Sequence, residues 1–199
     1  MITPAFVGGD EGRTTEWPAG RTPTLFRLRA EPPVWEFGDL LIRRYHPADL
    51  DTVLTLHREG LARVGLRPGD GVYYEYDLFQ MRELYLRDGG EFLVGTLETG
   101  RPVAMGGLRP FTGHGAQPSD VGEMVRLRVS PDVQRRGYGS AVVRALEERA
   151  RELGYLMLRG DTTSYQRPAL ELYRGFGWQE TRREIINGIT NIHLEKPLG

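Results

Sequence analysis

One stretch of the chain predicts a strand, a helix and a second strand in immediate succession. Residues 123–129 have the length and apolar content of a strand, and residues 137–153 repeat apolar side chains at helical spacing. Residues 155–158 (Tyr-Leu-Met-Leu) are apolar on both faces, which is typical of a strand covered on two sides. This order predicts a βαβ unit with parallel strands and a right-handed crossover. We therefore expect an α/β or α+β fold with a mixed sheet.

The remaining predicted elements surround this unit. Strands are predicted at 39–43, 91–97, 102–108, 179–183 and 190–194, and helices at 47–61, 76–87 and 168–174. The turn at 98–101 joins two of these strands into a hairpin, and residues 111–120 are expected to form a loop. Residues 1–36 are rich in Gly and Pro and include a loosely alternating strand candidate at 24–29. We interpret 1–36 as an N-terminal extension and 37–199 as one domain.

The composition argues against several classes of protein. With 26 Lys and Arg against 27 Asp and Glu, the formal net charge is −1, so a dedicated nucleic-acid-binding protein is not expected. The chain has no Cys, which excludes disulfides, thiolate metal sites and a cysteine nucleophile. Its four His residues lack metal-ligand spacing, and no metal is expected. We expect a cytoplasmic protein without a membrane partner, because no apolar run reaches the roughly 18 residues of a membrane span and residues 1–10 do not resemble a signal peptide.

The segment 129–140 joins the first strand of the βαβ unit to the helix and predicts an anion site. Gly137 and Gly139 stand at the helix entrance, where backbone N–H groups lack intrahelical partners and lie beside the positive end of the helix dipole. Arg135 and Arg136 add side chains that can pair with phosphate oxygens. The dinucleotide fingerprint lacks its third Gly or Ala here, and a Walker loop lacks its Lys. The alternative is a helix start in which the glycines only ease a tight turn.

Glu123 is a candidate general base. In a regular strand it would share a face with Val125, Leu127 and Val129, so its carboxylate would lie in line with core side chains. Desolvation raises the pKa of a carboxyl group and makes it a better base near neutral pH. The alternative is a solvated Glu123 at the strand end, and the sequence does not decide between the two.

Tyr173 is a candidate general acid. It ends the apolar face of the helix predicted at 168–174, which the glycines at 175 and 177 break. A phenol with an ordinary pKa of about 10 can deliver a proton to a departing thiolate whose pKa is about 8.5. A Tyr at such a position, taken alone, is more often a packed aromatic side chain.

Together these segments resemble the GNAT superfamily of acetyl-CoA-dependent N-acetyltransferases. The family has a strand with Glu and then the loop Gln/Arg-x-x-Gly-x-Gly/Ala, which residues 134–139 (Gln-Arg-Arg-Gly-Tyr-Gly) match. A second pattern, Asn-x-x-Ala-x-x-Leu-Tyr-x-x-x-Gly-Phe, is similar to residues 166–178, with Gln166 in place of Asn and Trp178 in place of Phe. The resemblance covers about residue 38 to the C-terminus. It implies that 37–199 is a GNAT domain, with a mixed central sheet flanked by helices and a βαβ acetyl-CoA-binding core.

The resemblance implies a role for each matching residue. Backbone amides of the loop would hold the pyrophosphate of CoA, and main-chain groups of the strand would pair with the pantetheine arm. Glu123 would take a proton from the attacking ammonium, Tyr173 would protonate the CoA thiolate, and an amide near Leu127 would stabilise the oxyanion. Transfer would be direct, since the chain has no Cys to carry the acetyl group. The implied cofactor-binding residues are Leu127, Arg128, Val129, Gln134, Arg135, Arg136, Gly137, Tyr138, Gly139, Ser140 and Gln166.

The family also implies a bulge that separates the strand of Glu123 from its parallel neighbour and disturbs the alternation at Arg126 and Arg128. The acceptor would enter from the opposite side, past an aromatic and acidic cluster at 73–77, or that cluster is a packed loop and helix start. Arg126 or Arg128 would bind an acceptor carboxylate or be ion-paired. Residues 161–163 lie where α/β sheets place ligands, or they cap a helix.

The leading hypothesis is an N-acetyltransferase that moves an acetyl group from acetyl-CoA to the primary amine of a small molecule, amino acid or peptide by direct attack. The alternative hypothesis is a non-catalytic acyl-CoA-binding sensor or partner module of the same fold. A homodimer is expected at the level of the family only.

Overall fold

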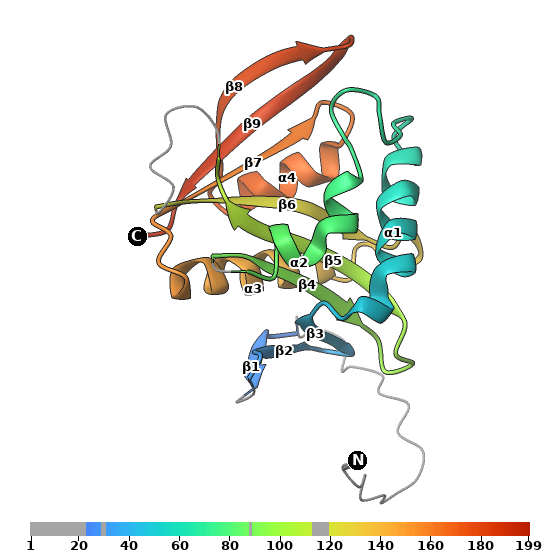
Figure 1. The fold of residues 1–199 in the computed structure, drawn as a ribbon, viewed down its shortest axis with the longest axis vertical. Coiled ribbons are helices and arrows are strands. Elements are labelled where there is room, and N and C mark those ends of the chain that lie inside the picture. Colours follow the sequence, from blue (N-terminus) through green and yellow to red (C-terminus); the bar gives the residue numbers. More distant parts are fainter. Residues whose placement is uncertain (1–22, 29–30, 88, 113–119) are drawn as a thin grey trace, which may run out of the picture.

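Nine strands form one mixed sheet in the described residues of the computed structural model, which are 23–28, 31–87, 89–112 and 120–199 (Figure 1). The strands are β1 (Phe26–Leu28), β2 (Val34–Phe37), β3 (Leu40–Arg44), β4 (Glu91–Thr96), β5 (Pro102–Pro110), β6 (Val121–Val129), β7 (Met157–Thr163), β8 (Gln179–Ile186) and β9 (Ile189–Pro197). The helices are η1 (Pro47–Asp49), α1 (Leu50–Ala62), η2 (Tyr76–Gln80), α2 (Met81–Leu84), η3 (Pro131–Val133), α3 (Tyr138–Glu152) and α4 (Arg167–Gly175). The order across the sheet is β1-β2-β3-β4-β5-β6-β7-β9-β8.

The pair β6–β7 is parallel, and the other neighbouring pairs are antiparallel. Since α3 connects the two parallel strands, the βαβ unit and the mixed sheet predicted from the sequence are confirmed. β7 differs from its prediction, because it begins two residues later than Tyr155 and continues to Thr163. Tyr155 lies three residues beyond the end of α3, and its N–H donates to the carbonyl of Ala150 in that helix. The polar residues after Leu158 remain in the strand because each residue of β7 pairs with β9.

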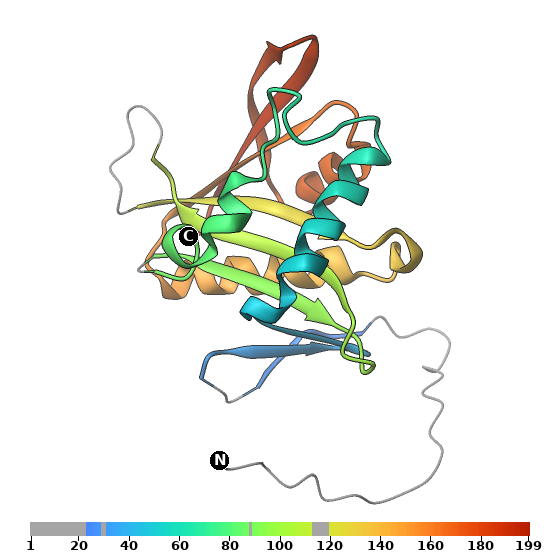
Figure 2. The ribbon, with the colours of Figure 1, turned by 45° about the vertical axis from the view of Figure 1, so that its right-hand side comes forward.

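Helices cover both faces of the sheet (Figure 2). α1, η2 and α2 lie over one face, around an apolar core that includes Leu56 and Phe92. α3 and α4 lie over the other face, around a larger core that includes Val142, Leu146 and Tyr173. Within the described residues, no helix has the length and apolar character that a membrane crossing requires.

Part of the N-terminal segment belongs to the sheet. The strand expected at 24–29 is present as β1, and β1 and β2 continue the sheet beyond β3. Trp35 of β2 is fully buried, and its indole N–H donates to Glu148 of α3 at 3.1 Å. The other parts of this segment, 1–22 and 29–30, lie outside the described residues, as do positions 113–119 of the expected loop.

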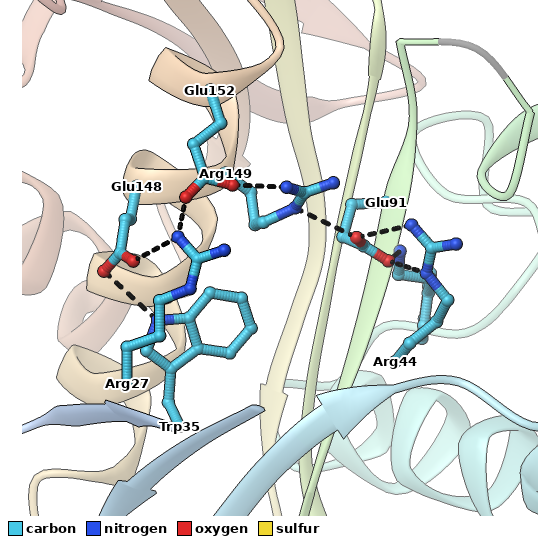
Figure 3. Close-up of polar contacts among 8 residues, drawn as sticks. Arg27, Trp35, Arg44, Glu91, Glu148, Arg149 and Glu152 are labelled. Carbon is cyan, nitrogen blue, oxygen red and sulfur yellow. Dashed lines mark hydrogen bonds and ion pairs between the residues drawn. The ribbon is translucent and has the colours of Figure 1, made fainter. Parts of the chain in front are cut away.

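A chain of ion pairs fixes α3 against the sheet (Figure 3). Glu91 of β4 is fully buried, and its carboxylate accepts hydrogen bonds from Arg44 at 2.7 and 2.8 Å and from Arg149 of α3 at 3.1 Å. Arg149 also pairs with Glu152, which in turn pairs with Arg27 of β1. A buried carboxylate is costly unless it is paired and hydrogen-bonded. The buried Glu91 therefore depends on both of its arginines.

Glu91→Gln is expected to lower the free energy of unfolding by about 3 kcal/mol, because two guanidinium groups lose their shared counter-charge. The matched control is Glu148→Gln, whose side chain is 38% exposed, and a change of no more than about 1 kcal/mol is expected there. Urea denaturation followed by circular dichroism measures both variants. Equally small losses for the two would contradict the structural role of Glu91.

Candidate active site

β6 contains a bulge at Arg126, whose φ of 59° lies in the left-handed region. Val125 pairs with Gly107 of β5, but Arg128, three residues further on, pairs with Met105, only two residues away on β5. β6 thus has one residue more than its partner at this point. Such an extra residue moves the following side chains to the opposite face of the sheet.

The bulge corrects the faces predicted for the side chains of β6. Val125 packs in the core beneath α1 and α2, and Glu123 shares its face. Leu127 and Val129 instead pack against the core beneath α3. The predicted common face for these four residues is wrong, because regular alternation does not allow for an inserted residue. The bulge implied by the family resemblance is present.

β6 and β7 separate early, since their pairing ends after residue 123. Beyond that point the edge of β6 has no strand partner on the side of β7 among the described residues. The carbonyl oxygen of Leu127 accepts from Nη1 of Arg128 at 2.7 Å, and that of Val129 accepts from Nε2 of Gln134 at 3.1 Å. Side chains therefore occupy the carbonyl oxygens of Leu127 and Val129, two of the main-chain groups that were expected to pair with a pantetheine arm.

The loop at 134–140 keeps its backbone donors available. α3 begins at Tyr138, and Gly137 precedes it with a left-handed φ of 85°. In the described part of the chain, the N–H groups of residues 134–140 have no hydrogen-bond acceptor. Arg135 is also left-handed, with a φ of 67°, and both it and Arg136 have exposed side chains. Several unpaired N–H groups beside two cations, at the positive end of a helix, fit a diphosphate.

The loop 134–140 packs against β2 and the β2–β3 turn at two places. The hydroxyl of Tyr138 donates to Asp39, between β2 and β3, at 2.5 Å. A Cβ at position 137 would lie 3.0 Å from Cζ of Phe37. Tyr138 therefore has a buried structural side chain, and only its backbone faces the predicted anion site.

A pocket of about 150 Å³ lies beside the bulge of β6, where β6 has separated from β7, and both the segment 72–76 and α4 contribute to its lining. Both residues predicted for acid–base chemistry, Glu123 and Tyr173, line it. Of the residues predicted to bind the cofactor, Leu127, Arg128 and Gln166 line the pocket, whereas Val129 and the loop 134–140 do not. The lining comprises Val72, Tyr73, Tyr74, Tyr76, Arg109, Glu123, Val125, Arg126, Leu127, Arg128, Asp161, Thr162, Gln166, Ala169 and Tyr173.

Glu123 has an arginine partner that the sequence did not indicate. Nε of Arg109, directly opposite on β5, lies 2.7 Å from Oε2 of Glu123. The Glu123 side chain is 21% exposed, so it is neither freely solvated nor enclosed by apolar side chains alone. Burial lowers the pKa of Arg109, but its interactions with Tyr85 and Glu123 outweigh this and raise the pKa. The register of two adjacent strands would have been needed to find this pair.

Tyr173 is both a packed aromatic residue and part of the pocket wall. Its ring lies 5.0 Å from that of Trp178, centroid to centroid. Burial raises the pKa of Tyr173 above its usual range, so the phenol keeps its proton. Beside it, Oε1 of Gln166 accepts hydrogen bonds from the hydroxyls of Tyr73 and Thr162, each at 2.7 Å. These bonds hold Gln166 within the pocket wall.

The acidic residues of the cluster at 73–77 are neutralised by arginines. Glu75 pairs with Arg58 at 2.8 and 2.9 Å, and the buried Asp77 binds Arg126 through two hydrogen bonds of 2.7 and 2.9 Å. Burial acts to raise the pKa of Asp77, but Arg126 outweighs it and the pKa is lowered. The aromatic part of the cluster does reach the pocket, as expected, but its carboxylates are already paired.

Asp161 of β7 places a second carboxylate in the pocket. Burial raises the pKa of Asp161, and the negative charge of Glu123 raises it further. Such a carboxyl group is a better proton acceptor near neutral pH. Its position towards the carboxyl end of a parallel strand was the sequence signal that placed it among the ligand candidates.

Comparison with known proteins identifies the family. The model of the acetyltransferase (GNAT) family matches residues 58–178. The chain belongs to this family. A relative from Schizosaccharomyces pombe, the uncharacterized N-acetyltransferase C1271.07c, is 30% identical over 148 residues, which cover 73% of this chain and 86% of the relative. The uncharacterized N-acetyltransferase YjgM of Escherichia coli is 26% identical over 140 residues, which cover 70% of this chain and 81% of the relative.

Solved structures show the same GNAT fold. A GNAT superfamily phosphinothricin acetyltransferase from Sinorhizobium meliloti, in complex with acetyl-CoA, superposes with a TM-score of 0.67 and 18% identity over 81% of this chain and 89% of that one. A GNAT-family acetyltransferase from Staphylococcus aureus Mu50 gives a TM-score of 0.67 and 14% identity over 80% of this chain and 99% of that one. The family, the fold and the enzyme class predicted from the sequence are thus confirmed.

Gly137→Ala is expected to weaken acetyl-CoA binding about tenfold, because the new Cβ strains a left-handed residue and presses on Phe37, which displaces the N–H groups of the loop. The matched control is Gly100→Ala, in the β4–β5 turn, where φ is 80° and a Cβ meets open space. Titration calorimetry with acetyl-CoA and thermal denaturation measure the two effects. Both variants are expected to lose stability, and equal acetyl-CoA affinity in both would contradict the assignment of the loop.

Proposed function

We propose that this protein transfers an acetyl group from acetyl-CoA to the primary amine of a small molecule, an amino acid or a peptide. The observation that carries the proposal is that Glu123 and Tyr173 line one pocket at the place where β6 leaves β7. A carboxylate and a protonated phenol in one pocket can accept and donate the protons that move during acetyl transfer.

The donor is assigned to the loop and to the free edge of β6. The N–H groups of residues 134–140 would hold the two phosphates next to each other in CoA, with Arg135 and Arg136 adding positive charge. The backbone of residues 127–129 would pair with the pantetheine arm as an added strand does. The thioester would then lie at the bulge, where an N–H near Leu127 would stabilise negative charge on its oxygen.

Glu123 and Tyr173 divide the proton transfers between them. Glu123, directly or through a water molecule, accepts the proton that an ammonium must lose before its nitrogen can attack the thioester carbon. As the C–N bond forms and the C–S bond breaks, Tyr173 donates a proton to sulfur and recovers one from the new amide nitrogen. Arg109 holds the Glu123 carboxylate in position. The chain contains no Cys, so the acetyl group passes directly to the amine.

Tyr173→Phe is expected to lower kcat about a hundredfold or more, because sulfur would leave without a proton donor. Glu123→Gln is expected to lower kcat as well, most strongly below the pKa of the amine, where the acceptor is protonated. The measurement is thiol release from acetyl-CoA over a panel of primary amines. Tyr165→Phe is the matched control, since that side chain is 52% exposed and outside the pocket.

Two results would contradict this proposal. Full activity in both Tyr173→Phe and Glu123→Gln would refute the assigned roles. Binding of CoA by calorimetry without thiol release from any amine would favour the alternative, a non-catalytic acyl-CoA-binding sensor or partner module of GNAT fold.

A further inference from the structure

Arg128 projects a guanidinium group with unused hydrogen-bond donors into the pocket wall. Its Nη1 donates to the carbonyl of Leu127 at 2.7 Å. Nε and Nη2 are buried and have no hydrogen-bond partner among the described residues. A buried donor without a partner costs free energy, and a charged one costs more. Arg128 therefore lines the pocket with a guanidinium group whose donors the described chain does not fully satisfy.

The other two arginines of the pocket are neutralised. Arg109 pairs with Glu123, and Arg126 pairs with Asp77. Arg128 has no ion pair with any described residue, and its guanidinium carbon lies 5.4 Å from the ring centroid of Tyr73. Burial lowers the pKa of Arg128, although Tyr73, Tyr173 and Asp161 act to raise it. Among the described residues, Arg128 is thus the arginine of the pocket lining that has no carboxylate within ion-pair distance.

α1 is shaped to admit this side chain. A Cβ at Gly60 would lie 2.7 Å from Cδ of Arg128. Glycine in a helix costs roughly 0.5–1 kcal/mol relative to alanine, and here it leaves the room that the stem of Arg128 occupies. The charge of Arg128 also acts on His57, one helix turn earlier, whose pKa falls to about 3 because of burial and then of Arg128. His57 is therefore neutral and adds no second positive charge beside Arg128.

We propose that Arg128 binds a carboxylate of the acceptor, so that the acceptor is an amine that also carries an acid group, such as an amino acid. A guanidinium fork with two free N–H donors matches the two oxygens of a carboxylate. The same pocket holds Asp161 and Glu123, which suit the ammonium end of such a molecule. This inference rests on the proposed acetyl transfer and narrows its acceptor.

The test compares the twenty L-amino acids with their primary carboxamides as acceptors, by thiol release from acetyl-CoA. The wild-type protein is expected to prefer an acid over its amide by at least about tenfold in kcat/KM. Arg128→Gln is expected to lose that preference, chiefly through a higher KM for the acid. Arg128→Lys should recover part of it, because the charge remains while the fork is lost. Gly60→Ala should act in the same direction as Arg128→Gln by displacing the stem.

The matched control is Arg82→Gln, an exposed arginine of α2 that does not line the pocket, and it should keep the wild-type preference. Acetyl-CoA affinity and thermal denaturation of each variant show that the fold and the donor site are intact. Equal use of acids and amides by the wild-type protein, or an unchanged preference in Arg128→Gln, would overturn the inference and leave acetyl transfer in place.

If no acceptor is turned over, the result counts against the proposed function. A second measurement then tests the carboxylate site by binding alone. Calorimetry then compares N-acetyl-L-amino acids with the matching N-acetyl amides, in the presence of CoA. Tighter binding of an acid that disappears in Arg128→Gln supports the carboxylate site. Failure of every acid to bind better than its amide overturns it.

Discussion

The early separation of β6 from β7 is the constraint on which the rest of the site depends. On its other side β6 remains paired with β5, so the strand is held along one edge and open along the other. The bulge at Arg126 accompanies this change and sends successive side chains to different faces. Leu127 and Val129 join the core beneath α3, while Arg128 reaches α1. One local irregularity thus produces a free main-chain edge, a pocket and a buried guanidinium together.

Charged side chains inside the molecule fall into two groups with different consequences. Glu91 and Glu147 are buried with cationic partners, Arg44 and Arg149 in the first case and Lys196 in the second. These pairs join strands and helices and serve the fold. At the pocket, by contrast, Arg128 has no ion pair with a described residue, and its Nε and Nη2 have no hydrogen-bond partner there. Departures from full satisfaction of polar groups are expected at functional sites rather than in the supporting structure.

Much of the fold could be predicted because hydrophobic periodicity records which faces are buried. The helix at 137–153 and the hairpin at 91–108 are within a few residues of α3 and of β4–β5. β7 was predicted too short because its polar half is held by pairing with β9, a contact between residues far apart in sequence. β2 escaped prediction for a similar reason, since Trp35 becomes a core residue only through packing against α3.

Individual residues of the site could be predicted from the sequence, but their contacts with one another could not. Glu123 and Tyr173 were recognised from their positions in motifs, and both line the pocket. The partner of Glu123 depends on the register between β5 and β6, which the sequence does not state. Arg128 has no ion pair with a described residue, because Asp77 binds Arg126 instead. The sequence does not indicate which of these two arginines lies within reach of Asp77.

The loop 134–140 packs on Phe37 and Asp39, so β2 and the β2–β3 turn contact the start of α3. A ligand that orders this loop also orders the two strands beneath it, so amide hydrogen exchange in β2 and β3 would slow when the loop is occupied. The same coupling sets a limit on shortening the chain. A version of the chain that begins just after Phe37 would lose the aromatic ring that lies beside Gly137. It would also lose Trp35, which bonds to Glu148 of α3, and the loop would have less support.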